Sequence, residues 1–170
     1  MKTAFLILVL LSNLASASEP INIESKRELF IDDFLIESLE NAEIRLSTPR
    51  DEGPVHKFDK SWEGPFCGYS TVIKDGGRYL LYYRGLPKSG KDGSEDETTC
   101  IITSTDGINW TRPELSNFLK KKYPRNNIIL ANAAPVTHNF PPFLDTNPNV
   151  IPDQKFKALG GTEKSGLIAY

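Results

Sequence analysis

Two acidic residues stand in segments that also hold aromatic, glycine and proline residues. Glu63 lies in residues 62–68, WEGPFCG, and Asp145 lies in residues 138–148, HNFPPFLDTNP. Two carboxyl groups can act as the acid and the base of one reaction if the fold brings them to a shared pocket. Whether Glu63 and Asp145 could share such a pocket depends on the fold, so the elements that position them must be worked out first.

Cysteine and histidine residues are too few to indicate a metal site. Only Cys67, Cys100, His56 and His138 occur, and there is no Cys-x-x-Cys pair. Each cysteine lies in an apolar, strand-like run, which favours two buried free thiols, although a disulfide is chemically possible outside the cytoplasm. We expect neither a metal nor another cofactor.

The start of the chain has the features of a secretory signal peptide. Lys2 is followed by an apolar run over residues 4–11 and then by Ala15-Ser16-Ala17, a small-residue cleavage site. The apolar run is too short to span a bilayer. We expect residues 1–17 to be removed and the protein to be secreted or periplasmic, with no membrane contact after cleavage. The formal net charge of −2 gives no indication of nucleic acid as a partner.

Short apolar runs broken by Gly, Pro, Asp and Asn predict an all-β chain. Residues 68–74 and 78–84 predict a hairpin across Asp75-Gly76-Gly77. A third strand is predicted over residues 98–103, and the turn STDGINW, residues 104–110, then leads to a short fourth strand through Thr111. Alternating residues between 29 and 46 suggest an additional opening hairpin.

Four successive antiparallel strands are the unit that a β-propeller repeats around its axis. The first such blade is expected at about residues 62–115. The pattern of residues 77–85 returns in residues 154–161, which predicts a second blade beginning at about residue 138. Because the chain stops at Tyr170 inside that blade, we expect it to be an N-terminal fragment in which residues 18–170 cover roughly two blades.

The turn also carries a resemblance to a known group of enzymes. The pattern Ser-x-Asp-Gly-x-x-Trp resembles the blade turns of five-bladed propeller glycosidases, the invertase, levanase and arabinanase group of glycoside hydrolase families 32 and 43. Its residues here are Ser104, Asp106, Gly107 and Trp110. The wider run from RELFIDDFLIES to KALGG looks like a secreted bacterial branch of that group, so the resemblance covers about residues 27–170. It implies a five-bladed β-propeller in which Asp106 and Gly107 make a structural turn and Trp110 packs in the core.

The resemblance implies hydrolysis of glycosidic bonds in poly- or oligosaccharides. That reaction needs one carboxyl group as nucleophile or base and one as acid, and such propellers gather them where the first strand of each blade begins. These positions correspond to Glu63 and Asp145. The family-32 motifs Asn-Asp-Pro-Asn and Arg-Asp-Pro are absent, and Asp145 with Asn147-Pro148 matches the second only loosely. The acid/base glutamate is then expected beyond Tyr170, and the alternative is a propeller that binds carbohydrate or protein without hydrolysis.

Residues around the two acids are candidates for binding the carbohydrate substrate. They are Trp62, His138, Asn139, Asn147 and Arg84. Trp62 could stack on a sugar ring or anchor a loop, and His138 with Asn139 could hydrogen bond to hydroxyls or be structural. Arg84 could pair with a carboxylate or mark the exit of its strand. The acids also have structural alternatives, because Asp145 can cap a turn and Glu63 can be a solvated loop residue.

Overall fold

The computed structural model describes residues 19–88 and 93–170, so the predicted signal peptide lies outside the described residues. The chain divides into one unit up to Pro49 and a second unit from Arg50 to Tyr170. Residues 19–49 contain no strand, and the predicted opening hairpin is therefore wrong. Apolar residues of this segment are largely exposed, as Leu29 and Leu46 are at 82% and 93%. Alternation of residue types does not stabilise a hairpin without a surface that covers its apolar face.

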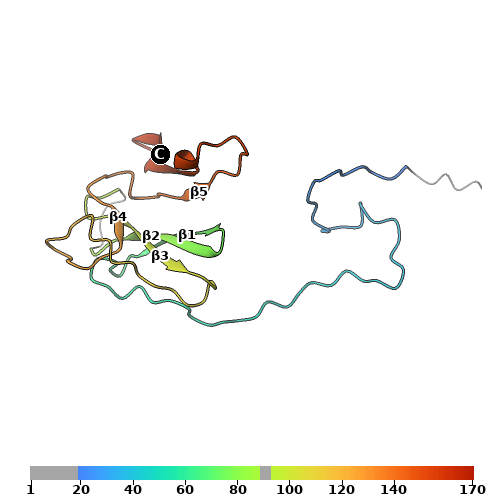
Figure 1. The fold of residues 1–170 in the computed structure, drawn as a ribbon, viewed down its shortest axis with the longest axis horizontal. Coiled ribbons are helices and arrows are strands. Elements are labelled where there is room, and N and C mark those ends of the chain that lie inside the picture. Colours follow the sequence, from blue (N-terminus) through green and yellow to red (C-terminus); the bar gives the residue numbers. More distant parts are fainter. Residues whose placement is uncertain (1–18, 89–92) are drawn as a thin grey trace, which may run out of the picture. The chain divides into compact units, whose positions relative to one another are not determined.

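The second unit begins with a four-stranded antiparallel sheet (Figure 1). Its strands are β1 (Gly68–Asp75), β2 (Arg78–Gly85), β3 (Thr98–Ser104) and β4 (Ile128–Leu130), and they lie side by side in chain order. The predicted hairpin of β1 and β2 is confirmed, with Asp75 opposite Arg78 across the turn. Gly76 has a φ of 60°, a left-handed conformation that glycine adopts without strain.

The fourth strand lies further along the chain than predicted. Thr111 forms only an isolated bridge to Thr103, and the chain then leaves the sheet and returns as β4. Pro113 follows two residues after that bridge and has no N–H to donate, so pairing cannot continue there. The sequence pattern marked the bridge correctly and missed the return of Ile128, which is fully buried.

The predicted turn after β3 is confirmed as a structural element. Asp106 Oδ1 accepts hydrogen bonds from the backbone N–H groups of Ile108 and Asn109, at 2.8 and 2.7 Å, and from Ser104 Oγ at 2.9 Å. Hydrogen bonds led by the one from the Asn109 side chain hold the pKa of Asp106 far below its usual range. Trp110 packs against the core cluster, and its Nε1 donates to Gly107 O at 3.0 Å.

A second antiparallel sheet follows, with strands β5 (Pro142–Leu144), β6 (Phe156–Thr162) and β7 (Gly166–Ala169) in that order. A 3-10 helix, η1 (Pro152–Gln154), connects β5 to β6. Strands are therefore present in the region of the second predicted blade, and β-strands and the short η1 are the regular elements of the described part of the chain. None of its helical segments has the length and apolar character needed to cross a membrane.

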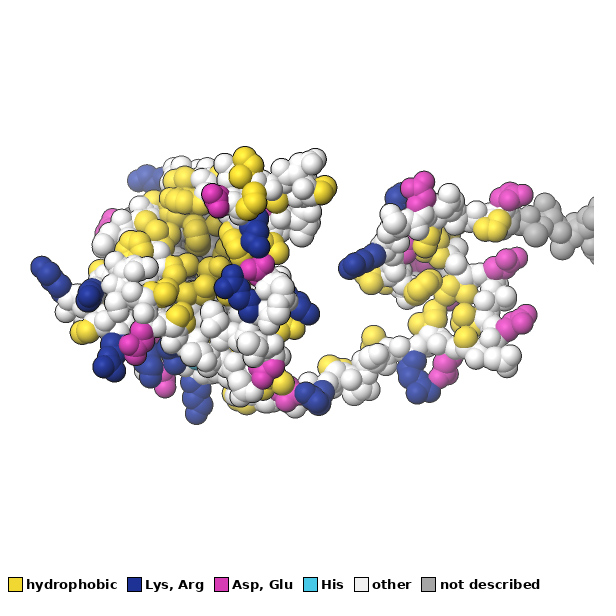
Figure 2. Space-filling view, in the orientation of Figure 1, with side chains coloured by type: hydrophobic (Ala, Val, Ile, Leu, Met, Phe, Trp, Pro, Cys, Tyr) yellow, Lys and Arg dark blue, Asp and Glu magenta, His cyan; other side chains and the backbone are white. Residues whose placement is uncertain are grey.

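The two faces of the first sheet have different neighbours. Tyr83 pairs with Cys100 in the register, and both point into a core cluster with Ile102, Tyr123 and Ile128. Figure 2 shows hydrophobic side chains gathered in the middle of this unit, with Lys and Arg around its edge. Side chains alternate along a strand, so Tyr82 and Arg84 point to the opposite face. The second sheet lies on that side, where β5 contacts β1 and Phe156 lines a small cavity with Tyr82.

Candidate functional site

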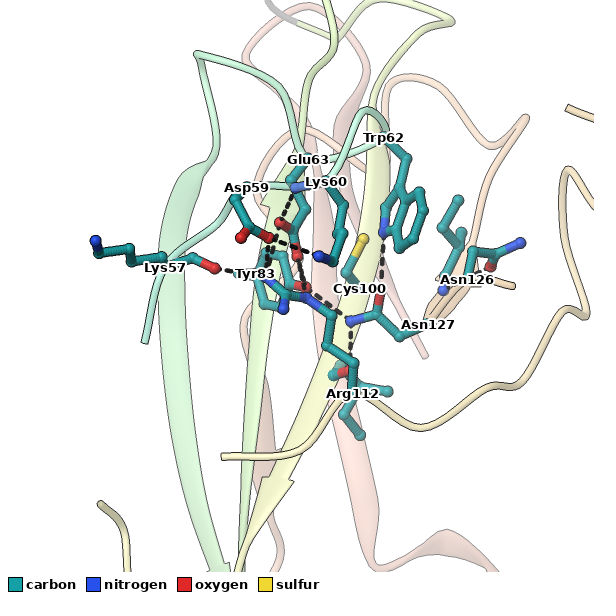
Figure 3. A network of polar contacts seen from close by, with 12 residues as sticks. Lys57, Asp59, Lys60, Trp62, Glu63, Tyr83, Cys100, Arg112, Asn126 and Asn127 are labelled. Atoms are coloured by element: carbon teal, nitrogen blue, oxygen red, sulfur yellow. Dashed lines mark hydrogen bonds and ion pairs between the residues drawn. The ribbon is translucent and has the colours of Figure 1, made fainter. Parts of the chain in front are cut away.

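Glu63 lies at the centre of a buried network on the core face of the first sheet (Figure 3). Its carboxylate accepts two hydrogen bonds from Arg112, from Nε to Oε1 at 2.9 Å and from Nη2 to Oε2 at 3.0 Å. Tyr83 Oη donates to Oε1 at 2.6 Å, and the backbone N–H of Lys60 donates to Oε2 at 2.8 Å. Four donors from three residues therefore surround one carboxylate that is 0% exposed.

Trp62 and Asn127 extend this network. The Asn127 amide donates to Tyr83 Oη and to Ile101 O, both at 2.7 Å, and accepts from Trp62 Nε1 at 2.8 Å. The indole also lies against Tyr123, with ring centroids 5.6 Å apart. The structure thus shows the loop-anchoring contacts that the sequence left as one alternative for Trp62.

The local backbone holds Glu63 in this position. Leu86 N–H donates to Glu63 O at 2.8 Å, and Gly64 follows with a φ of 67°. A Cβ on Gly64 would lie 2.4 Å from Leu86 O, so only glycine permits this close approach. The interpretation of Glu63 as a solvated loop acid is wrong, because its side chain is fully enclosed by donors.

A second polar cluster lies on the opposite face, where β2 ends and β3 begins. Arg84 Nη1 and Glu97 Oε1 each lie 3.1 Å from His138 Nδ1, and Arg84 Nη1 lies 3.7 Å from Glu97 Oε1. Arg84 also donates to Phe66 O at 3.3 Å and covers the ring of Tyr69 at 4.4 Å. The structure therefore brings Arg84 and His138, two predicted binding residues, into contact, and Arg84 pairs with a carboxylate as one alternative proposed.

This cluster contains buried polar atoms that have no hydrogen-bond partner within residues 19–88 and 93–170. They include Glu97 Oε2, Arg84 Nε, Thr99 Oγ1 and Thr137 Oγ1. Glu97 is 1% exposed, so its carboxylate is removed from bulk water. Buried polar groups are nearly always hydrogen-bonded, and unused capacity concentrated in one place is a feature of sites that take polar ligands or ordered water.

A pocket opens beside this cluster, with a volume of about 520 Å³. His138 and Asn139 line one side of it, and residues of the β6–β7 hairpin, including Thr162, Glu163 and Leu167, line the other. His138 therefore belongs both to the buried cluster and to the pocket wall. Amide, hydroxyl and carboxylate groups stand here beside apolar surface, a combination typical of small-molecule sites.

Asp145 and Asn147 lie away from this pocket, at the end of β5. Asp145 forms an ion pair with Lys157 and accepts the backbone N–H of Asn147 at 2.8 Å. The Lys157 ammonium, and then the Asn147 N–H, lower the pKa of Asp145 below its ordinary value. Asp145 thus makes the turn-capping contact that the sequence left as an alternative, and Asn147 is exposed.

The structure does not bring Glu63 and Asp145 together. Glu63 reaches Tyr83 on the core face of the first sheet, whereas the second sheet, which carries Asp145, covers the other face. The two acids also lie near opposite ends of β1. The N–H of Asp145 donates to the carbonyl of Lys155, and Lys155 pairs with Asp75 at the turn end of β1, whereas Glu63 precedes the start of β1. A sheet therefore separates the two carboxylates, and they cannot act on one bond in this arrangement.

Sequence reasoning missed the residues that complete both clusters. Arg112 and Asn127 are partners of the Glu63 network, and Glu97 is the acid beside His138. Glu97 had a usable signal, because it directly precedes the apolar run that predicted the third strand. Arg112 had none, since its partner lies 49 residues away.

Comparisons with known proteins add no family to this description. No protein-family model, curated protein or solved structure matches the chain. Within the part of the chain that the structure describes, no group of three or more His, Cys, Asp or Glu residues could hold a metal ion. The functional conclusion therefore depends on the two clusters and the pocket.

Proposed function

We propose that the chain contributes two blades to a carbohydrate-binding β-propeller, and that the pocket beside His138 is its sugar site. Two antiparallel sheets that each run in chain order, and the Asp106-Gly107 turn after β3, support this fold. The observation that carries the site is that His138 connects a buried polar cluster to the wall of the pocket.

The lining of the pocket suits a polyhydroxylated ring. Asn139, Thr162 and Glu163 offer donors and acceptors at its rim, and Leu159 and Leu167 offer apolar surface. A sugar presents hydroxyl groups around its edge and C–H groups on its face, so it can use both kinds of contact. Behind the rim, Arg84 and Glu97 fix the ring of His138.

Hydrolysis of a glycosidic bond is the second candidate function. Asp145 is the residue for it, because hydrolysis needs a carboxylate as nucleophile or base and the Asp145 side chain is partly exposed at the end of β5. Binding is the better supported of the two, since Glu63 and Asp145 lie on opposite sides of the first sheet. Export of the protein is part of the same proposal. The mass of the exported chain should then match a polypeptide that starts near Ser18.

The test is a titration of the full chain against a panel of neutral oligosaccharides, followed by an assay for released reducing ends. Asn139→Ala should weaken the best ligand about three- to tenfold, the effect of one lost hydrogen bond. Asn117→Ala, an exposed control in the loop before β4, should leave the affinity unchanged.

The outcomes separate the candidates. Binding without release of reducing ends supports the binding function, and release that Asp145→Asn abolishes supports the hydrolase. If no oligosaccharide binds, or if Asn139→Ala and Asn117→Ala behave alike, the pocket is not a sugar site.

A further inference from the structure

A second groove lies on the core side of the first sheet, away from the His138 pocket. It has a volume of about 420 Å³ and is lined by Trp62, Tyr123, Lys122, Pro124, Arg125 and Ser61. Trp62 and Tyr123 both belong to the core cluster or pack against it. The groove is therefore a place where the aromatic core reaches the surface.

Trp62 is held in a fixed orientation at this groove. Its Nε1 donates to Asn127 Oδ1 at 2.8 Å, and Asn127 is itself fully buried and bonded to Tyr83. Tyr123 lies against the indole at an interplanar angle of 52°. An aromatic side chain anchored in this way presents apolar ring surface with little loss of conformational entropy on binding.

The rim of the groove is positively charged. Lys120, Lys121 and Lys122 precede Tyr123, and these three lysines form no ion pair within the described ranges 19–88 and 93–170. Lys122 Nζ lies 5.1 Å from the centre of the Tyr123 ring. Arg125 Nε lies 4.0 Å from Glu114 Oε2, which is the one acidic contact at this rim among the residues described. Cations therefore exceed acids here, although the chain has a formal net charge of −2.

We propose that this groove binds an acidic saccharide, one that carries carboxylate or sulfate groups. The half-buried Trp62 ring, backed by Tyr123, can stack on the apolar face of a sugar ring, while Lys122 and Arg125 pair with its anionic groups. Charge complementarity selects an anionic sugar over a neutral one at this surface. The inference rests on the proposed function in one respect, that the ligand is a saccharide. The two sites can be tested separately, because the groove and the His138 pocket share no residue.

The test uses the full chain with an oligogalacturonate, the same oligosaccharide after reduction of its carboxyl groups, a sulfated cello-oligosaccharide and polyglutamate. The double variant Lys122→Ser/Arg125→Ser should weaken oligogalacturonate binding about five- to tenfold, as expected for two exposed ion pairs. The control double variant Lys26→Ser/Arg45→Ser removes the same charge from exposed residues of the first unit and should leave binding unchanged. Carboxyl reduction removes the same ion pairs and should weaken binding at the groove by at least as much, and added salt should weaken binding of the acidic ligand.

Tryptophan fluorescence distinguishes stacking on Trp62 from ion pairing alone, because ion pairing away from the indole should not change its emission. Trp62 and Trp110 are the two tryptophans of the sequence. Oligogalacturonate should change the emission of the wild-type chain and of Trp110→Phe, and this change should be absent in Trp62→Phe. The sulfated ligand decides whether the site accepts both anionic groups or the carboxylate alone.

Several results would contradict the proposal that the groove binds an acidic saccharide and leave the proposed sugar site at His138 unaffected. Equal affinity for polyglutamate would indicate anion binding without recognition of a sugar, and equal loss in both double variants would indicate a general charge effect. If Asn139→Ala weakens oligogalacturonate while the Lys122/Arg125 variant does not, the acidic sugar occupies the His138 pocket instead. If only neutral sugars bind, the proposed function stands and the groove inference fails.

Discussion

Replacement of Glu63 by glutamine should destabilise the fold strongly. Glutamine has nearly the same shape, but it removes the charge that pairs with Arg112. It also turns an NH2 group toward either the Arg112 guanidinium or the Lys60 N–H, both of which are donors. A donor would then face a donor inside a site that is 0% exposed.

The expected loss in the free energy of unfolding is about 3 kcal/mol. Removing one partner of a buried ion pair typically costs about 3–5 kcal/mol. The lower end applies because the Arg112 side chain is 21% exposed and has a second acidic contact, Asp59 Oδ1 at 3.3 Å. Tyr83→Phe removes one hydrogen bond to the same carboxylate and should cost about 1.5–3 kcal/mol.

Urea denaturation followed by tryptophan fluorescence measures these losses. Glu95→Gln is the matched control, because Glu95 is exposed, and it should change the free energy of unfolding by less than about 0.5 kcal/mol. The reasoning is refuted if Glu63→Gln unfolds at the same urea concentration as the control. Lost sugar hydrolysis at unchanged stability would instead return Glu63 to the catalytic role suggested by its sequence context.

Three further predictions follow from the core and from the edge of the second sheet. Gly64→Ala should lower the free energy of unfolding by about 2 kcal/mol or more. Gly53→Ala should cost less, because Gly53 has a similar φ but no atom within 4 Å of an added Cβ. Equal losses of unfolding free energy in denaturant titrations would contradict the steric reasoning. Burial raises the pKa of Cys67 and Cys100 to about 12, so neither thiol should react with iodoacetamide at pH 8 until urea is added, and rapid alkylation of the native chain in a mass spectrum would disagree. Folding lowers the pKa of Asp145, so the contribution of this residue to stability is present above pH 3.8 and is lost as the pH falls through the lowered pKa. Asp145→Asn should therefore make stability less sensitive to acid in denaturation curves. An unchanged pH profile would count against the ion pair.

Elements set by neighbouring residues could be predicted from the sequence. The β1–β2 hairpin depends on Gly76 in a left-handed turn, and the turn at Asp106 depends on hydrogen bonds to residues two and three positions away. The free state of Cys67 and Cys100 was also predicted, and both are free in the structure. Each of these features needs only local patterns or the apolar character of a strand.

Features set by distant partners could not be predicted in the same way. β4 pairs with β3 only after a long excursion, and Glu63 meets Arg112 across 49 residues. The segment between residues 29 and 46 has a strand-like alternation, yet it forms no strand and most of its apolar side chains are exposed among the described residues 19–49. Glu97 and His138 meet because two sheets pack together, a relation that no spacing in the sequence records.

A titration of ¹⁵N-labelled chain with its best neutral oligosaccharide tests the proposed sugar site most directly. Amide signals of Asn139, Thr162 and Glu163 should shift together, with smaller shifts around Glu97 through His138. Signals around Glu63 and Arg112 should stay in place. Shifts that cluster at Glu63, or an unchanged spectrum around Asn139, would contradict the assignment of this pocket.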